Sequence, residues 1–147
     1  MSASTGGPAS PDATPSPQRV PALLVMHADL AEALLRAASR IYGPIEDLVV
    51  ISNEGLSRID LERNIVAAAG RWPAGGLVFT DFWGGSCHTS GIATARACQD
   101  VVILTGVNLP LLLDYLHNRD HTDVETLAER LQVKGRESIR VQHGPPA

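Results

Sequence analysis

Short apolar segments alternate with stretches of helical periodicity along most of this chain. Four of these segments are mostly apolar, which is typical of strands buried inside a parallel sheet. They are residues 20–26, 47–52, 75–81 and 101–106. Between and after them, apolar side chains recur every three or four positions, which predicts amphipathic helices. These helices are expected at residues 30–41, 57–70, 86–99, 109–117 and from residue 122 onward.

Capping residues indicate where some of these helices begin. Segments 57–60 and 122–125 are spaced as capping boxes, with Ser or Thr followed three positions later by an acidic residue. Asn108 stands where an N-cap is expected, two residues before a proline. Residues 138–142 alternate in polarity and predict a short edge strand. The repeated strand–helix order predicts an α/β fold, with helices on both faces of a parallel sheet.

Length and composition indicate one folded domain. The chain has 147 residues, of which 44% are hydrophobic. Residues 1–19 are mostly Ser, Ala, Thr, Gly and Pro, so we expect a disordered tail there and a folded domain over residues 20–147. A net charge of −4 without a Lys/Arg cluster argues against a nucleic-acid partner.

The chain also lacks the patterns of membrane-spanning and secreted proteins. The longest unbroken apolar run covers five residues, whereas a membrane span needs about 20. No basic start followed by an apolar stretch marks a secretory signal. Cys87 and Cys98 share one predicted helix, about 16 Å apart, which excludes a disulfide, and two cysteines alone do not make a zinc site. We therefore expect a reduced, cytoplasmic protein.

Residues with useful chemistry follow the first and third predicted strands. His27 comes directly after the first strand, and Thr80 and Asp81 end the third. A Gly84-Gly85-Ser86 turn then leads into the next helix. In open parallel sheets, ligands gather beyond the carboxyl ends of the strands. If the two strands are neighbours, these residues share one rim.

Together these residues predict a site that accepts a phosphoryl group. A neutral imidazole is a good nucleophile near neutral pH, so His27 is the candidate acceptor. Asp81 is the candidate for orienting the ring, because a carboxylate bonded to one ring nitrogen leaves the other free. The Gly84-Gly85-Ser86 turn offers backbone N–H groups, a hydroxyl and a helix N-terminus to an anion. Such a site requires no metal and no cofactor.

Each residue also has a simpler interpretation. A lone histidine after a strand is commonly a loop residue, Asp81 alone a turn or cap residue, and Gly-Gly-Ser an ordinary turn. Cys87 stands at a helix N-terminus, where a thiol pKa can fall, although no general base is evident beside it. The remaining histidines are expected on the surface; they are His88, His117, His121 and His143.

Three segments resemble a known family. They are residues 27–35, the Thr80-Asp81-Phe82-Trp83-Gly84-Gly85-Ser86 stretch, and the Gly-Val-Asn-Leu-Pro stretch at 106–110 with the leucines that follow. In order and spacing they are similar to the mannose/fructose-type enzyme IIA domain of the bacterial phosphoenolpyruvate-dependent sugar phosphotransferase system. The resemblance covers about residues 21–142.

The resemblance implies a doubly wound sheet of four parallel strands plus one antiparallel strand. It also implies a homodimer in which the C-terminal strand is exchanged or packed at the interface. His27 would accept a phosphoryl group from the histidine-containing phosphocarrier protein and pass it to an enzyme IIB protein. Asp81 would orient His27, while Thr80 and Ser86 match hydroxyl-bearing surroundings of the phosphate.

The chain departs from the family pattern at three positions. Ala28 replaces the usual Gly after the histidine, Cys87 replaces a Pro, and His88 stands where Asn-like or small residues are common. One alternative is a stand-alone regulatory module, whose phosphorylation state controls a partner protein instead of sugar uptake. Others are the phosphoryl donor of a dihydroxyacetone kinase, a flavodoxin-like small-ligand binder and an aspartate-phosphorylated receiver.

Overall fold

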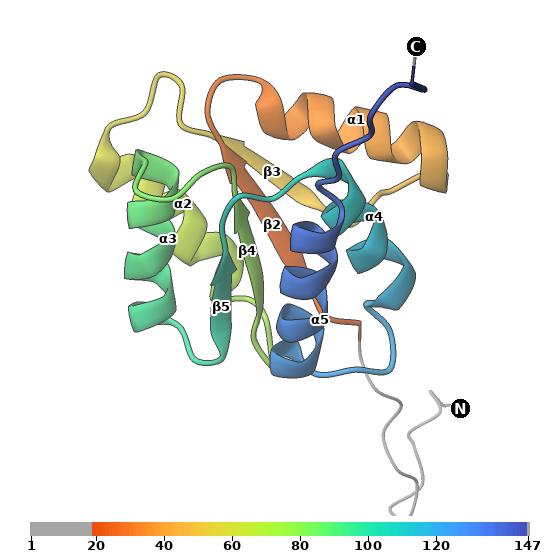
Figure 1. Cartoon of the computed structure of the whole chain (residues 1–147). Helices are drawn as coiled ribbons and strands as arrows, with labels where there is room; N and C mark the ends of the chain where they lie inside the picture. Colours follow the sequence, from red (N-terminus) through yellow and green to blue (C-terminus); the bar gives the residue numbers. More distant parts are fainter. Residues whose placement is uncertain (1–18, 147) are drawn as a thin grey trace, which may run out of the picture.

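The computed structural model describes residues 19–146, so nearly all of the predicted tail at 1–19 lies outside the described residues. The described chain forms a four-stranded sheet and five helices (Figure 1). The strands are β2 (Ala22–Met26), β3 (Val49–Ser52), β4 (Gly76–Thr80) and β5 (Val101–Leu104). The helices are α1 (Leu30–Tyr42), α2 (Arg58–Ala69), α3 (Ser86–Ala97), α4 (Leu109–Asn118) and α5 (Val124–Glu137).

All four strands are parallel and lie in the order β3-β2-β4-β5. The central strands β2 and β4 are buried along their whole length, as expected where helices cover both faces. Val25 near the end of β2 pairs with Ile51 of β3 on one side and Thr80 of β4 on the other. The direction of winding changes between β2 and β4, and this switch point is where doubly wound sheets bind ligands.

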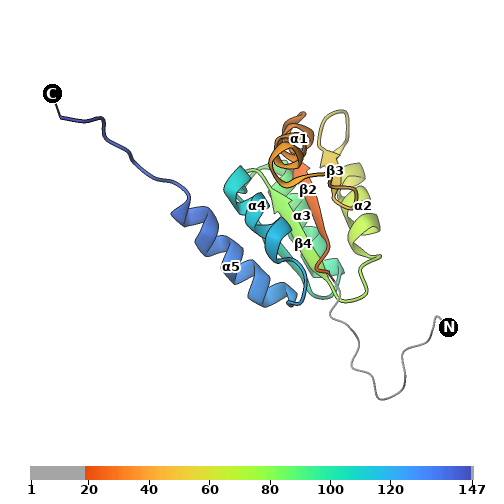
Figure 2. The ribbon, with the colours of Figure 1, turned by 90° about the vertical axis from the view of Figure 1, so that its right-hand side faces the viewer.

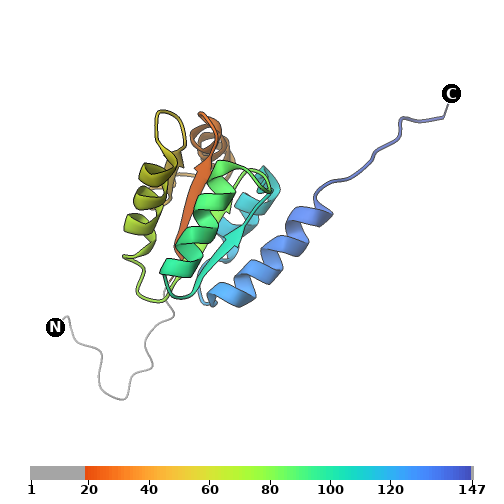
Figure 3. The same ribbon diagram turned by 90° about the vertical axis from the view of Figure 1, so that its left-hand side faces the viewer.

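Two helical layers cover the sheet (Figures 2 and 3). Helices α1, α4 and α5 cover one face, where Leu24, Phe79 and Tyr115 belong to the larger apolar cluster. Helices α2 and α3 cover the other face, and Ile65 and Val78 belong to the cluster beneath them. Alternate residues of each strand enter opposite clusters, because side chains along a strand point to opposite faces. The predicted parallel α/β sheet with helices on both faces is confirmed.

The helix starts agree with the capping predictions, with one exception. The side chains of Ser57 and Asn108 accept from backbone N–H groups at 3.1 Å each and cap α2 and α4. At α5 the prediction that Thr122 is the N-cap is wrong by one residue. Asp123 is the cap there, because its carboxylate accepts both the N–H and the hydroxyl of Thr126, at 2.8 and 3.0 Å.

The predicted edge strand at residues 138–142 is not formed. Helix α5 continues to Glu137, and the chain then leaves the domain (Figures 2 and 3). Ile139 and Val141, the apolar positions of the alternating pattern, are 79% and 82% exposed. A strand needs a sheet edge to pair with, and this segment runs away from the edges of its own sheet.

Both cysteines are free, as their separation predicted. Cys87 lies in the first turn of α3 and is buried, whereas Cys98 is the partly exposed C-cap of the same helix. Among the described residues, we find no helix with the length and apolar character needed to cross a membrane.

Candidate active site

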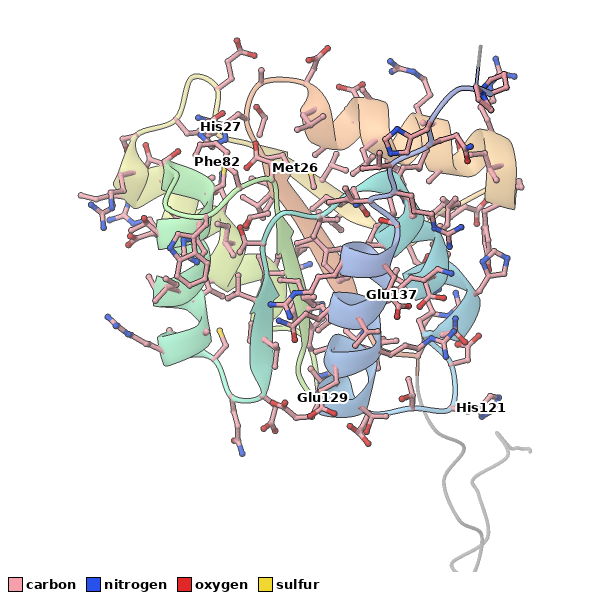
Figure 4. The ribbon with its side chains drawn as sticks, in the orientation of Figure 1. Met26, His27, Phe82, His121, Glu129 and Glu137 are labelled. Atoms are coloured by element: carbon pink, nitrogen blue, oxygen red, sulfur yellow. The ribbon has the colours of Figure 1, made fainter. Side chains whose placement is uncertain are left out.

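The carboxyl ends of β2 and β4 bring together two residues that are 54 positions apart. His27 follows β2, and Nδ1 of its ring lies 2.8 Å from Oδ2 of Asp81, which follows β4. The backbone N–H of His27 donates to the same oxygen at 2.9 Å. The Asp81 side chain is only 9% exposed, but the His27 side chain is 34% exposed. Figure 4 shows His27 at this end of the sheet, beside Phe82.

The hydrogen bonds of Asp81 determine which ring nitrogen of His27 is free. Its second oxygen, Oδ1, accepts from the backbone N–H of Phe82 at 3.2 Å. Both oxygens therefore accept from backbone N–H groups, as an ionised carboxylate does. In the neutral ring of His27 the proton then belongs on Nδ1, where it is donated to Asp81. Nε2 keeps its lone pair and is the nucleophilic atom.

The turn before α3 lies beside this free nitrogen. The hydroxyl of Ser86 is 3.4 Å from Nε2 of His27. Gly85 is the N-cap of α3 and has no side chain to accept from the first-turn N–H groups, which suits that turn to an anion. A Cβ on Gly85 would lie 2.7 Å from Cζ of Phe82 and 3.0 Å from Cε1 of His27. Glycine is therefore required for the turn to approach the imidazole this closely.

An aromatic side chain packs against the imidazole. The rings of Phe82 and His27 are stacked, with centroids 4.9 Å apart and an interplanar angle of 27°. Phe82 is 51% exposed and Trp83, next in the chain, is 77% exposed. In the sequence, Phe82 and Trp83 stand out only as part of a motif. The signal that could have singled them out is the presence of two large apolar side chains directly after a predicted strand.

Thr80 is enclosed, unlike the other predicted phosphoryl-binding residues. It is fully buried, and its Oγ1 has no hydrogen-bond partner within the described residues. Its backbone carbonyl accepts from the N–H of Val107, which ties β4 to the loop after β5. The role of the Thr80 hydroxyl stays a prediction.

The expectation that His88 lies on the surface is wrong. His88 is 6% exposed, and its Nδ1 accepts from the backbone N–H of Gly84 at 2.9 Å. Its ring packs against Trp83 with centroids 4.5 Å apart. His88 thus anchors the turn that faces His27, because α3 places it one helical turn after Gly84. The other three histidines are exposed as predicted: His117, His121 and His143.

Cys87 does not have the environment of a reactive thiol. Burial, together with the nearby negative charge of Asp81, raises the pKa of Cys87 to about 11. A position at a helix N-terminus would lower the pKa of the thiol, but desolvation of the thiolate raises it by more. Cys87 packs in the apolar cluster with Ile65 and Val78 and is a neutral thiol at physiological pH.

The residue after His27 adopts a backbone conformation that favours glycine. Ala28 has φ = 51°, in the left-handed region. The last residue of β3, Ser52, and the residue after it, Asn53, hold it there. The hydroxyl of Ser52 donates to the Ala28 carbonyl at 2.6 Å, and Oδ1 of Asn53 accepts from the Ala28 N–H at 3.1 Å. Neither residue was among the candidates predicted from the sequence, although their position where the second predicted strand ends was a usable signal.

We expect Ala28→Gly to stabilise the protein by about 1 kcal/mol. Left-handed backbone costs a residue with a Cβ about 1–2 kcal/mol, and the greater freedom of Gly in the unfolded chain offsets part of the gain. Denaturant unfolding measures the change. Ala33→Gly is the matched control, because Ala33 lies inside α1, where Gly destabilises by about 1 kcal/mol. Destabilisation by Ala28→Gly would contradict this account of the loop.

Comparison with known proteins identifies the family. The sequence model described as "PTS system fructose IIA component" matches residues 22–132. The "PTS system fructose-specific EIIA component" of Bacillus subtilis (strain 168) is 24% identical over 118 residues, which cover 78% of this chain and 81% of that protein.

Two solved structures have a similar fold. The phosphotransferase component EIIA from Streptococcus agalactiae superposes with a TM-score of 0.78 at 23% identity, covering 83% of this chain and 96% of that one. The mannose/sorbose-specific IIA subunit from Enterococcus faecalis superposes with a TM-score of 0.75 at 20% identity, covering 88% of this chain and 99% of that one. With a family match over most of the described domain, the chain belongs to the fructose IIA component family of the phosphotransferase system.

Proposed function

We propose that this chain is a phosphocarrier of a phosphoenolpyruvate-dependent sugar phosphotransferase system. Nε2 of His27 accepts a phosphoryl group from the histidine-containing phosphocarrier protein and passes it to an enzyme IIB protein. The observation that carries this proposal is the 2.8 Å contact between Nδ1 of His27 and Asp81. That contact leaves a lone pair on Nε2, beside Ser86. Members of this family are phosphotransferase components, which agrees with this chemistry.

In the transfer, a bond forms between Nε2 and phosphorus as the bond between phosphorus and the donor nitrogen breaks. The His27 ring becomes positively charged, because Nδ1 keeps its proton. The negative charge of Asp81, 2.8 Å from Nδ1, stabilises this ring. The Ser86 hydroxyl and the first-turn N–H groups of α3 are placed to donate to the phosphoryl oxygens.

The surroundings of His27 favour a protein as phosphoryl donor. Small-molecule sites are usually concave and bury most of the ligand. His27 is instead partly exposed and lies beside two exposed aromatic residues, Phe82 and Trp83. Aromatic residues are enriched in protein–protein interfaces.

The exposed apolar residues of segment 138–142 similarly support the proposal of a homodimer. A regulatory role toward a partner protein would use the same phosphorylation step.

Phosphoryl transfer from a purified donor tests the function directly. The full chain is mixed with the phosphorylated histidine-containing phosphocarrier protein, and its intact mass is followed at neutral to alkaline pH. We expect a gain of one phosphoryl group that is lost on acid treatment, because phosphohistidine is acid-labile. An unchanged mass with a phosphorylated cognate donor would contradict the proposal.

A further inference from the structure

The candidate active site contains a third group with ligand chemistry, which the phosphocarrier mechanism does not use. Ligand atoms of His27, Asp81 and Cys87 all lie within 4.8 Å of one another. Among the described residues, this is the one cluster of three or more His, Cys, Asp or Glu that could hold a metal ion. Imidazole nitrogen, carboxylate oxygen and thiolate sulfur are the three ligand types that zinc uses in proteins.

We propose that a zinc ion binds His27, Asp81 and Cys87 and blocks phosphorylation of His27. The metal part rests on geometry alone; the inhibition rests on the proposed function. Three protein ligands leave the fourth tetrahedral position for water, as in zinc sites that keep an open position. The partly exposed His27 side chain lies on the open side of the site.

The distances suit a tetrahedral ion after a small adjustment. Zinc bond lengths of about 2.0–2.3 Å separate neighbouring ligand atoms by about 3.5 Å. Nδ1 of His27 and Oδ2 of Asp81 are 2.8 Å apart, so these two side chains need to open slightly. The Cys87 sulfur lies within 4.8 Å of the other two ligand atoms and needs to close by at most about 1 Å. The adjustment falls on a His27 side chain that is 34% exposed and so is not enclosed on every side.

The charge balance explains why Cys87 matters. Cys87 is a neutral thiol in the metal-free protein, and the charge of the bound ion drives its deprotonation. The proton passes to solvent, and the sulfur becomes a thiolate ligand. A dication with one carboxylate, one thiolate and one neutral imidazole has no net charge. This matters because the N-terminus of α3 carries a positive partial charge, which disfavours an uncompensated cation. Without the thiolate, the complex would keep one positive charge there.

Zinc binding and phosphorylation exclude each other for a chemical reason. A neutral imidazole has one ring nitrogen that carries hydrogen and one that carries the available lone pair. Whichever nitrogen binds the metal uses that lone pair, and the other nitrogen then carries the proton. The metal-bound ring therefore has no nucleophile to offer phosphorus.

Cobalt titration tests the site without measuring activity. The reduced, tag-free full chain is titrated with Co²⁺, whose bond to a thiolate gives a near-ultraviolet charge-transfer band. We expect saturation at one Co²⁺ per chain, bleaching by Zn²⁺ and no effect of Mg²⁺, which prefers oxygen ligands. The band should be lost in Cys87→Ser and kept in the matched control Cys98→Ser. A wild type without the band, or a Cys87→Ser variant that retains it, would overturn the site.

Phosphorylation with and without zinc tests the inhibition. Zinc is expected to slow transfer to wild type and Cys98→Ser by about tenfold or more, since the metal occupies the lone pair of His27. A chelator should restore the rate, and the ratio of rates with and without zinc should be near one in Cys87→Ser. Equal rates for zinc-loaded and zinc-free wild type would overturn the inhibition. Failure of the zinc-free protein to accept phosphoryl counts against the proposed function alone, because the cobalt band reports on the site independently.

Discussion

Replacing His27 by Ala is expected to abolish phosphorylation of this chain while leaving the domain folded. The substitution removes Nε2, the atom that forms the bond to phosphorus, and no other histidine shares its surroundings. The ring is one-third exposed and contacts Phe82 and Asp81 at the rim, outside the two apolar clusters. We therefore expect the free energy of unfolding to change by only about 1 kcal/mol.

Intact mass after incubation with the phosphorylated donor measures the effect, and circular dichroism reports the fold. His121→Asn is the matched control. His121 is exposed, lies far from His27 (Figure 4) and has φ = 61°, a conformation that Asn tolerates. This variant should be phosphorylated like wild type. Phosphorylation of His27→Ala at the wild-type level would place the acceptor elsewhere.

Asp81→Asn is expected to slow phosphoryl transfer by about 100-fold or more, the usual range for losing a group that acts on a proton or charge in the transition state. Both carboxylate oxygens accept from N–H groups: Oδ2 from the backbone and ring of His27, and Oδ1 from the backbone of Phe82. An amide has only one oxygen. If it faces His27, the negative charge that stabilises the phosphorylated ring is lost; if it faces Phe82, the tautomer is lost as well.

The rate of phosphorylation under single-turnover conditions measures this loss. Asp29→Asn is the control for net charge, because Asp29 is exposed near the same rim and its side chain makes no capping hydrogen bond to α1. That variant should transfer within about twofold of wild type, since an exposed charge is well screened. A wild-type rate for Asp81→Asn would show that Asp81 does not act on His27.

The environments of Cys87 and His88 show where sequence reasoning fails. Both lie near the start of a predicted helix, where exposure and a lowered thiol pKa are reasonable expectations. In the structure the first turn of α3 packs against the end of β4, so Cys87 joins an apolar cluster and His88 is covered by Trp83. The burial of a side chain depends on the packing of helix against sheet, and helical periodicity in α3 is weak because its residues are small.

The sequence by itself determined the parallel α/β architecture, because buried strands and amphipathic helices have different hydrophobic periods that can be counted along the chain. It also determined which residues follow the strands, and hence that His27, Asp81 and Ser86 were the candidates. Only the tertiary structure decided the atomic contacts. The tautomer of His27 follows from two backbone N–H groups that both donate to Asp81. The left-handed backbone of Ala28 is held by hydrogen bonds to the last residue of β3 and to the residue after it. The predicted fifth strand fails for the same reason, because a strand exists only where a sheet edge is within reach, and no local pattern records where that edge lies.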